Sequence, residues 1–412
     1  MTKADEVAPA PERLHALDAV RGFALLLGIV LHATLSFMPT GPSRIWIIQD
    51  SHPSATLGVL FFAIHVFRMT TFFLIAGFFA HLSFHRRGAW GFIKDRLQRI
   101  AVPLLVGWPI LFAAMVAVTM WAAGFPNGGP LPGSRRWPPV LPRFPLTHLW
   151  FLYVLLELYA AVLVARAGVV WLDPNGRVRA RIDGLIGLVM QSRLAPAILA
   201  VPIGIALCLD PTWIAWFGVR TPDSSLVTNL QAWIGFGTAF GFGWLLHRQV
   251  DLIRMLERRW LLNSVLAVGL TAVSFFLAVT ASTPPFRIGY SAIKFAIAVC
   301  YALAIWTTTF AAIGLALRFL AGFSPTRRYL ADASYWLYLI HLPILMALQV
   351  AVSGLDWPWP IKFAVILLIA LPLMFASYQW LVRYSFIGTV LNGRRERGER
   401  TPAVTSAGSA PA

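Results

Sequence analysis

Long apolar segments alternate with short polar ones along almost the entire chain. A window of about 20 residues, the length that a helix needs to cross a bilayer, separates these segments from the loops between them. We expect transmembrane helices over the segments 19–38, 57–83, 100–123, 146–165, 195–217, 226–246, 261–280, 289–317, 333–352 and 361–384. The pattern therefore predicts an all-α, polytopic integral membrane protein with about ten transmembrane helices, surrounded by a lipid bilayer.

Composition supports a lipid environment. The mean hydropathy is +0.70, and 58% of the residues are hydrophobic while only 12% are charged, which excludes an ordinary soluble domain. The net charge of +17 does not indicate nucleic-acid binding, because the basic residues are spread over short loops. Cys208 and Cys300 lie far apart within apolar segments, so we expect neither a disulfide nor a metal site.

Lysine and arginine are distributed unevenly between alternate loops. Most of them lie in one set of segments, which comprises the N-terminus, 84–99, 166–194, 247–260, 318–332 and the chain after 384. The positive-inside rule places this set, and with it both termini, in the cytoplasm. The polar ends 1–16 and 386–412 should be disordered, and 17–385 should form one membrane domain.

The first apolar segment carries charged and titratable residues. Its start, Leu17–Gly22, contains Asp18 and Arg21, and the apolar run continues to His32. Such groups cost several kcal/mol in hydrocarbon, so they are candidates for a functional site. At about 100° per residue, Arg21 and His32 share one helix face about 16 Å apart along the axis, and Asp18 can pair with Arg21. The pattern predicts a cation near one membrane surface and a proton acceptor near mid-depth.

Further basic residues lie within the second segment and just after it. His65 and Arg68 are three residues apart and share a helix face, either as an interfacial pair that reaches water or as part of a site directed inward. Arg96 and Arg99 follow on the cytoplasmic side. They are either ordinary positive-inside residues or part of an arginine cluster that binds a phosphate-rich donor, since guanidinium groups match phosphate oxygens.

Later segments add four more residues to consider. His148 and Trp150 open the fourth segment, where these residue types commonly form an interfacial belt. His341 lies about halfway across the ninth segment, as a residue of helix packing or of a cavity wall. Glu157, in the middle of the fourth segment, should be paired or protonated.

These residues fall in motifs that resemble those of the acyltransferase family 3 membrane proteins. The motifs are Leu17–Gly22 with His32, then 65–69, 72–78, 96–103, 148–152 and 338–343, in the order that the family shows, within about residues 14–385. The segments 65–69 and 148–152 are similar to the branch that succinylates periplasmic glucans in Gram-negative bacteria. Ala76 stands where the family often has serine, so no hydroxyl role is expected there.

The resemblance implies a bacterial inner-membrane enzyme that transfers an acyl group from cytoplasmic acyl-CoA to a hydroxyl acceptor, often a sugar, on the far side of the membrane or within it. Acyl-CoA, with a succinyl or an acetyl group, would be a co-substrate, and no tightly bound cofactor is expected. The resemblance assigns catalysis to His32 and Arg21, with His32 as general base, acyl-CoA binding to Arg21, Arg96, Arg99 and Asp18, and contacts to the acceptor or the oxyanion to His65, Arg68, His148, Trp150 and His341.

Two other classes of protein stay open at this point. A transporter or exporter could use arginine and histidine within the membrane as a substrate or proton path. A structural scaffold is the third class, although it has no need for charged residues in its apolar segments. The acyl group, the acceptor and the oligomeric state do not follow from the sequence.

Overall fold

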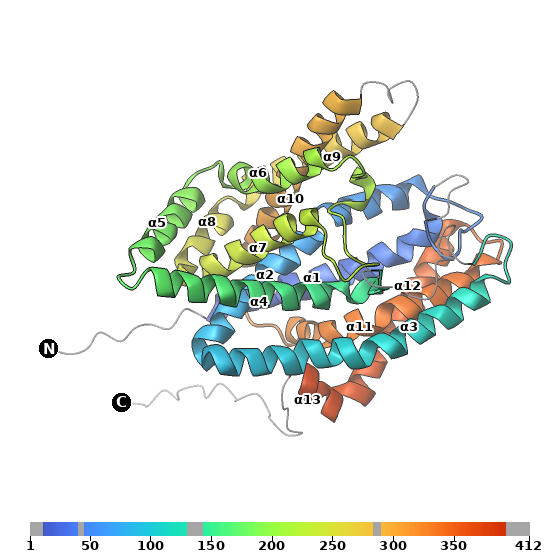
Figure 1. Ribbon diagram of the computed structural model, residues 1–412. Helices are drawn as coiled ribbons and strands as arrows, with labels where there is room; N and C mark the ends of the chain where they lie inside the picture. Colours follow the sequence, from blue (N-terminus) through green and yellow to red (C-terminus); the bar gives the residue numbers. More distant parts are fainter. Residues whose placement is uncertain (1–10, 40–44, 130–142, 283–289, 393–412) are drawn as a thin grey trace, which may run out of the picture.

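The computed structural model describes residues 11–39, 45–129, 143–282 and 290–392, which form a bundle of helices with no β-sheet (Figure 1). The predicted all-α fold class is confirmed. Most of the two predicted tails, 1–10 and 393–412, lies outside the described residues. The α-helices are α1 (Pro11–Thr34), α2 (Ala55–Arg96), α3 (Val102–Ala122), α4 (Trp150–Leu172), α5 (Arg177–Gln191), α6 (Ala195–Leu209), α7 (Leu230–Arg248), α8 (Ile253–Arg258), α9 (Trp260–Ser282), α10 (Tyr290–Phe319), α11 (Pro325–Ser353), α12 (Trp359–Ser377) and α13 (Phe386–Asn392).

Each of the ten predicted segments overlaps a helix, and most of these helices are long and apolar enough to cross a membrane. By length and composition, seven helical runs among the described residues could cross a membrane, or eight if the pair α5 and α6, bent by 108°, counts as one span. The run Ala55–Ala122 contains two of the predicted segments. Helix α6 has only 15 residues, which is too short to span alone. The all-α, polytopic architecture is therefore confirmed.

A sharp turn lets the chain enter and leave the bundle within the run 55–122. Gly88 interrupts the helical geometry of α2 with φ 68° and ψ 179°, a backbone conformation that favours glycine. The π-helix η2 (Leu97–Ala101) then joins α2 to α3. Figure 1 shows that the chain turns at this point and returns as α3. The turn carries Arg96 and Arg99 to the end of the bundle where α1 begins.

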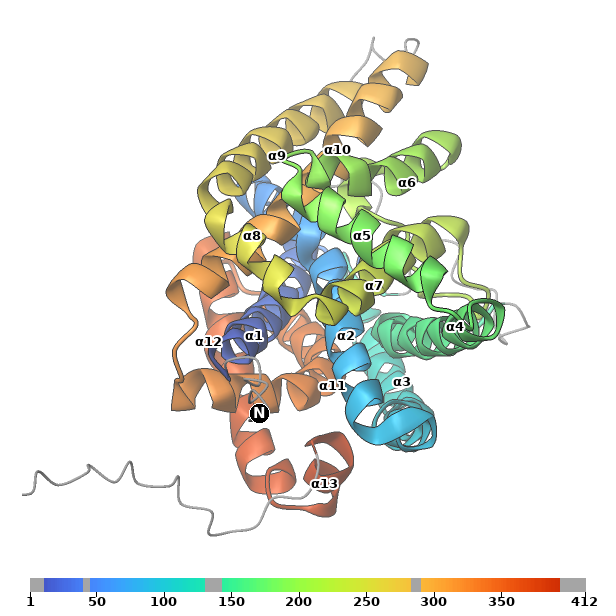
Figure 2. The ribbon, with the colours of Figure 1, turned by 90° about the vertical axis from the view of Figure 1, so that its left-hand side faces the viewer.

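Helix α1 is central to the packing. It packs against α2, α10, α11 and α12, while α9 and α10 form a hairpin that projects from the bundle (Figure 2). Helices α2 and α7 approach closely at two glycines: a Cβ on Gly77 would collide with the carbonyl of Phe240, and one on Gly243 with that of Leu74. Small residues of this kind allow tight helix packing in lipid. These packing contacts therefore fix the positions of α1, α2 and α11 relative to one another.

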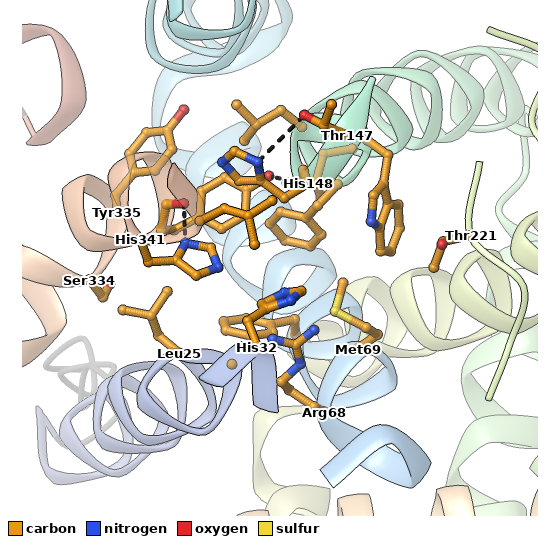
Figure 3. A pocket seen from close by; sticks show the side chains of 18 of the residues that line it. Leu25, His32, Arg68, Met69, Thr147, His148, Thr221, Ser334, Tyr335 and His341 are labelled. Atoms are coloured by element: carbon orange, nitrogen blue, oxygen red, sulfur yellow. Dashed lines mark hydrogen bonds between the residues drawn. The ribbon is translucent and has the colours of Figure 1, made fainter. Parts of the chain in front are cut away.

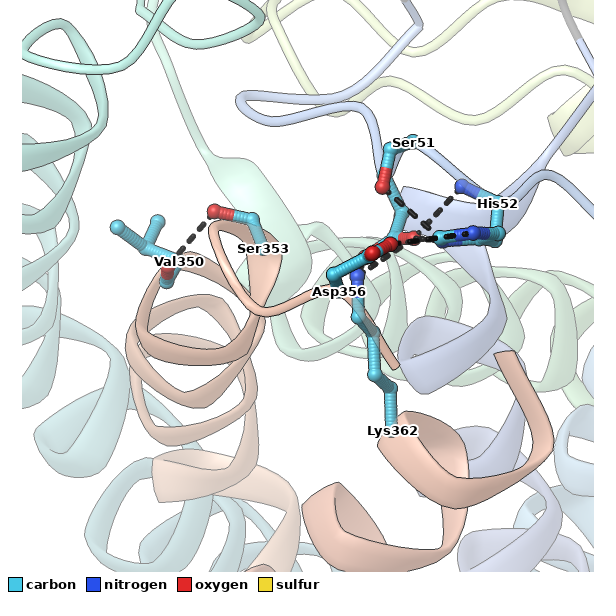
Figure 4. A network of polar contacts seen from close by, with 7 residues as sticks. Ser51, His52, Val350, Ser353, Asp356 and Lys362 are labelled. Carbon is cyan, nitrogen blue, oxygen red and sulfur yellow. Dashed lines mark hydrogen bonds and ion pairs between the residues drawn. The ribbon is translucent and has the colours of Figure 1, made fainter. Parts of the chain in front are cut away.

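A buried ion pair fixes the segment that follows α1. Lys362, on α12, lies 2.8 and 3.0 Å from the two carboxylate oxygens of Asp50 (Figure 4). The same carboxylate accepts a hydrogen bond from the backbone N–H of His52, and the backbone N–H of Asp50 donates to the carbonyl of Ser36. An unpaired buried charge is costly, so this pair ties the C-terminal end of α1 to α12.

Candidate active site

A cavity of about 810 Å³ brings together nearly all of the residues singled out in the sequence. Its walls come mainly from α1, α2, α3, α4 and α11. Asp18 does not line it but contacts a residue that does. The predicted site residues that line the cavity are Arg21, His32, His65, Arg68, Arg96, Arg99, His148, Trp150 and His341.

One end of the cavity, which we call the arginine end, is formed by Arg21, Arg96 and Arg99. Arg21 lies 3.3 Å from the carboxylate of Asp18 and donates a hydrogen bond to the carbonyl of Ala331 at 3.2 Å. The predicted pairing of Asp18 with Arg21 is thus present in the structure. The carboxylate holds the guanidinium near the start of α1, where it lines the cavity.

Asp95 organises the other two arginines of this end. Its side chain is buried, and it pairs with Arg99 at 2.9 Å, with Arg96 at 3.6 Å and with Arg87 across the Gly88 turn. One carboxylate thus faces three guanidinium groups, which leaves the cluster positively charged. Asp95 is not among the predicted site residues, because its only signal in the sequence is one acidic residue within a basic run. Because like charges repel, Asp95 keeps Arg96 and Arg99 close together.

Aromatic residues complete the arginine end. The guanidinium carbon of Arg96 lies 5.1 Å from the ring centroids of Phe92 and Tyr159, a distance typical of cation–π contacts. The hydroxyl of Tyr335 donates to the backbone carbonyl of Arg99 at 2.6 Å. Burial raises the cost of moving these side chains, so the end presents a fixed positive surface to an anion.

The opposite region, which we call the histidine end, contains His32, His65, Arg68, His148 and His341. His32 lies near the end of α1, where the carbonyls of a helix lack intrahelical partners. Gln349 supplies the missing partners. Its amide group donates to the carbonyls of His32 and Ala33 at 3.0 and 3.1 Å, and its side-chain oxygen accepts from Trp46. The Nδ1 atom of His32 has no hydrogen-bond partner among the described residues. The backbone of His32 is thus fixed while its ring stays available.

His341 adjoins His32, with 5.1 Å between the ring centroids (Figure 3). Its Nδ1 lies 2.7 Å from the carbonyl of Tyr338, and because a carbonyl only accepts, Nδ1 carries the proton. The Nε2 atom of neutral His341 is then an acceptor, and it has no hydrogen-bond partner among the described residues. Neutral His341 therefore has no N–H left to donate to a ligand.

His148 joins α4 to α11. Its Nε2 donates to the carbonyl of Leu339 at 2.9 Å, and its own carbonyl accepts from the hydroxyl of Tyr338 at 2.6 Å. The Nε2–H group is thereby used within the protein. Trp150, two residues further along the chain, is 8% exposed because its ring packs against Phe236 and Phe73. Both residues form part of the cavity wall, and only a small part of Trp150 faces the cavity.

Arg68 projects from α2 toward α1 beside His32 (Figure 3). Its guanidinium lies over Gly28, where a Cβ would collide with Nη1. No carboxylate among the described residues pairs with Arg68, and its Nε lacks a hydrogen-bond partner there. His65, one turn away, also has an unpartnered Nδ1. A cation held in this way is suited to a negative group that is not part of the protein.

Glu157 is not part of this arrangement. Its carboxylate accepts a hydrogen bond from the hydroxyl of Thr228 at 2.6 Å, as expected for an acidic residue in the middle of a span. It is absent from the cavity wall. Among the described residues there is also no group of histidine, cysteine and acidic side chains that could hold a metal ion.

A family model described as an acyltransferase domain, that of acyltransferase family 3, matches residues 14–379. The chain belongs to acyltransferase family 3. The match includes every residue of the arginine end and of the histidine end. The resemblance deduced from the motifs is thereby confirmed, and the protein is a membrane acyltransferase.

Curated relatives carry the name glucans biosynthesis protein C. The proteins of Escherichia coli O6:K15:H31 (strain 536) and of Shigella dysenteriae serotype 1 (strain Sd197) are each 31% identical to this chain, over 148 and 156 residues. Each match covers 36% of this chain, and the chain spans 37% of each relative's length. No solved structure matches.

The Asp95 cluster leads to the first test. Asp95→Asn should let Arg96 and Arg99 separate, because their shared counter-charge is lost. We expect binding of CoA, the ligand that the resemblance implies, to weaken about tenfold, which corresponds to about 1.4 kcal/mol. Isothermal titration of CoA into the purified protein measures this. Asp183→Asn is the matched control, because it breaks an aspartate–arginine pair whose residues do not line the cavity. Equal or tighter CoA binding by Asp95→Asn would contradict the assigned role.

Proposed function

We propose that this acyltransferase moves a succinyl or acetyl group from cytoplasmic acyl-CoA to a hydroxyl of an outward-facing glycan, such as a glucan. The observation that carries the proposal is the single cavity that joins the arginine end to the histidine end. Along α1, Arg21 and His32 are about 16 Å apart, which is of the order of an extended pantetheine arm. A donor held by its phosphates at the arginine end therefore brings its thioester to His32.

The orientation in the membrane follows from the charge pattern. Helix α1 begins at the arginine end, and the basic segment 84–99 contributes Arg96 and Arg99 to the same end. The positive-inside rule places this end in the cytoplasm, together with both termini, as expected for a bacterial inner-membrane protein. The donor then enters from the cytoplasm, where acyl-CoA is made, and the acceptor enters from the opposite side.

His32 acts as the general base. A hydroxyl is a poor nucleophile, and a neutral imidazole can accept its proton as the oxygen attacks the thioester carbon. The tetrahedral intermediate then collapses with cleavage of the carbon–sulfur bond, and the departing CoA thiolate takes the proton from His32. The unpartnered Nδ1 and the fixed backbone of His32 support this role. Arg21 contributes by holding the donor rather than by proton transfer.

Arg68 stabilises the oxyanion of the intermediate. It is the cation beside His32 that no carboxylate of the described residues neutralises, and a developing negative charge is what such a group stabilises best. His341 does not serve as oxyanion donor in its neutral form, because its N–H group is used by the carbonyl of Tyr338. We assign to His341 the role of positioning the His32 ring, which it contacts.

The name of the curated relatives connects those proteins with glucan biosynthesis, which supports a glucan as the acceptor. In this chain, His65, His148 and Trp150 line the same cavity as His32. Trp150 and His65 would contact a sugar there, while His148 maintains the shape of the wall through its bonds to α11.

Replacing His32 tests the general base directly. His32→Ala should lower kcat by about 10²- to 10⁴-fold while CoA binding stays within about twofold, because the lost interaction exists only in the transition state. The assay is acceptor-dependent release of the CoA thiol from succinyl-CoA and from acetyl-CoA. His81→Ala serves as control, since His81 pairs with His247 outside the cavity. Near-full turnover by His32→Ala would remove the assignment.

Replacing Arg68 tests the oxyanion role. Arg68→Met should lower kcat by about 10²- to 10³-fold, the loss that follows removal of an oxyanion donor, with little change in the KM for either substrate. Gly28→Ala, which displaces the guanidinium without removing it, should show a smaller loss of kcat. If Arg68→Met instead raises the KM for one substrate at unchanged kcat, Arg68 is a binding residue for that substrate.

A further inference from the structure

The short helix α13 contributes to the wall of the arginine end. Leu391 and Asn392, its last two residues, line the cavity together with Arg96 and Arg99. The helix packs against η2, which carries Arg99, and against α11. The sequence predicts a disordered tail from residue 386, whereas the structure forms a helix over Phe386–Asn392 (Figure 1).

Local contacts determine the position of α13. The hydroxyl of Ser385 accepts a hydrogen bond from the backbone N–H of Ile387 at the start of the helix. Gly388 lies against the preceding turn, where a Cβ would collide with the carbonyl of Val382. Leu391 is 5% exposed and belongs to the hydrophobic core. These contacts hold α13 against the bundle rather than leaving it in solvent.

The end of α13 is bound to α11 by a side chain. The Nδ2 of Asn392 donates to the backbone carbonyl of Asp332 at 2.9 Å, and both residues line the cavity. The oxygen Oδ1 of Asn392 remains an acceptor. Residues 386–392 lie beyond the family match, which ends at residue 379. The family relationship therefore does not account for this part of the wall.

The ligand chemistry at this place follows from the order of groups along an acyl-CoA molecule, so the next step rests on the proposed function. With the thioester at His32 and the phosphates at the arginine end, the nucleotide base lies furthest from the reacting centre. An asparagine side chain is a common partner of adenine, because its oxygen accepts from the amino group of the base. An aliphatic neighbour such as Leu391 offers apolar contact to the ring.

We infer that α13 is part of the donor site, and that Leu391 and Asn392 contact the nucleotide end of acyl-CoA. The helix forms the wall that an adenine meets after the phosphates have bound. No bond is made or broken there; the contribution is to affinity and to selection of a nucleotide-bearing donor.

Full-chain variants with two donors test this inference. Asn392→Ala should raise the KM for acyl-CoA at least fivefold and leave kcat and the KM for the acceptor unchanged. With S-acyl-pantetheine, which lacks the nucleotide, the same variant should match the wild-type protein. Gly388→Ala, which displaces the helix, should reproduce both results. Thr389→Ala is the matched control, because Thr389 is exposed on the same helix and does not line the cavity.

The outcomes separate this inference from the proposed function. If the wild-type protein neither binds CoA nor releases its thiol, the proposed function itself fails. If the wild-type protein uses acyl-CoA and Asn392→Ala uses it equally well, only the role of α13 is overturned. An equal loss with acyl-CoA and with S-acyl-pantetheine would show that α13 merely stabilises the fold, and would also overturn the inference.

Discussion

The structure depends on how it holds positive charge inside an apolar bundle. A cation in a low-dielectric interior is costly unless an opposite charge approaches it. At the arginine end, Asp18 and Asp95 partly neutralise the guanidinium groups, which leaves a net positive surface for a ligand that binds and departs. At the histidine end, Arg68 has no carboxylate partner among the described residues. The arginine end thus suits a group with a permanent negative charge, and the histidine end suits a negative charge that forms only transiently.

The packing of the helices fixes the positions of the charged residues at the two ends of the cavity. Helix α1 carries one residue of each end, and Gln349 and the Asp50–Lys362 pair fix the position of its C-terminal end. The close approach of α2 at Gly28 puts Arg68 beside His32. The arginine end and the histidine end therefore open into one cavity, in which the proposed donor and acceptor would meet.

Much of this site could be predicted from the sequence, because the relevant spacing lies within single helices. The face shared by Arg21 and His32, and the neighbouring positions of Asp18 and Arg21, depend only on helical periodicity. The order of the motifs, which indicated the family, is likewise a property of the chain. The helical fold class follows from hydropathy, although hydropathy did not show that α6, with 15 residues, is too short to cross alone.

Contacts between distant segments were not predictable in this way. Asp95 is one acidic residue in a basic run, and only the turn at Gly88 brings Arg87 back to it. The N–H group of His341 is committed to Tyr338 through a hydrogen bond that periodicity does not specify. Helix α13 follows the last apolar segment and resembles a tail until Gly388 and Asn392 are seen in their packed positions.

The central claim is that the donor enters at the arginine end and reaches His32 through one cavity. Membrane vesicles of known orientation that contain the protein test it, because acyl-CoA does not cross a bilayer. Thiol release should occur when acyl-CoA is added to the face on which α1 begins, and the acylated acceptor should appear on the opposite face. Thiol release only from the opposite face would contradict the account.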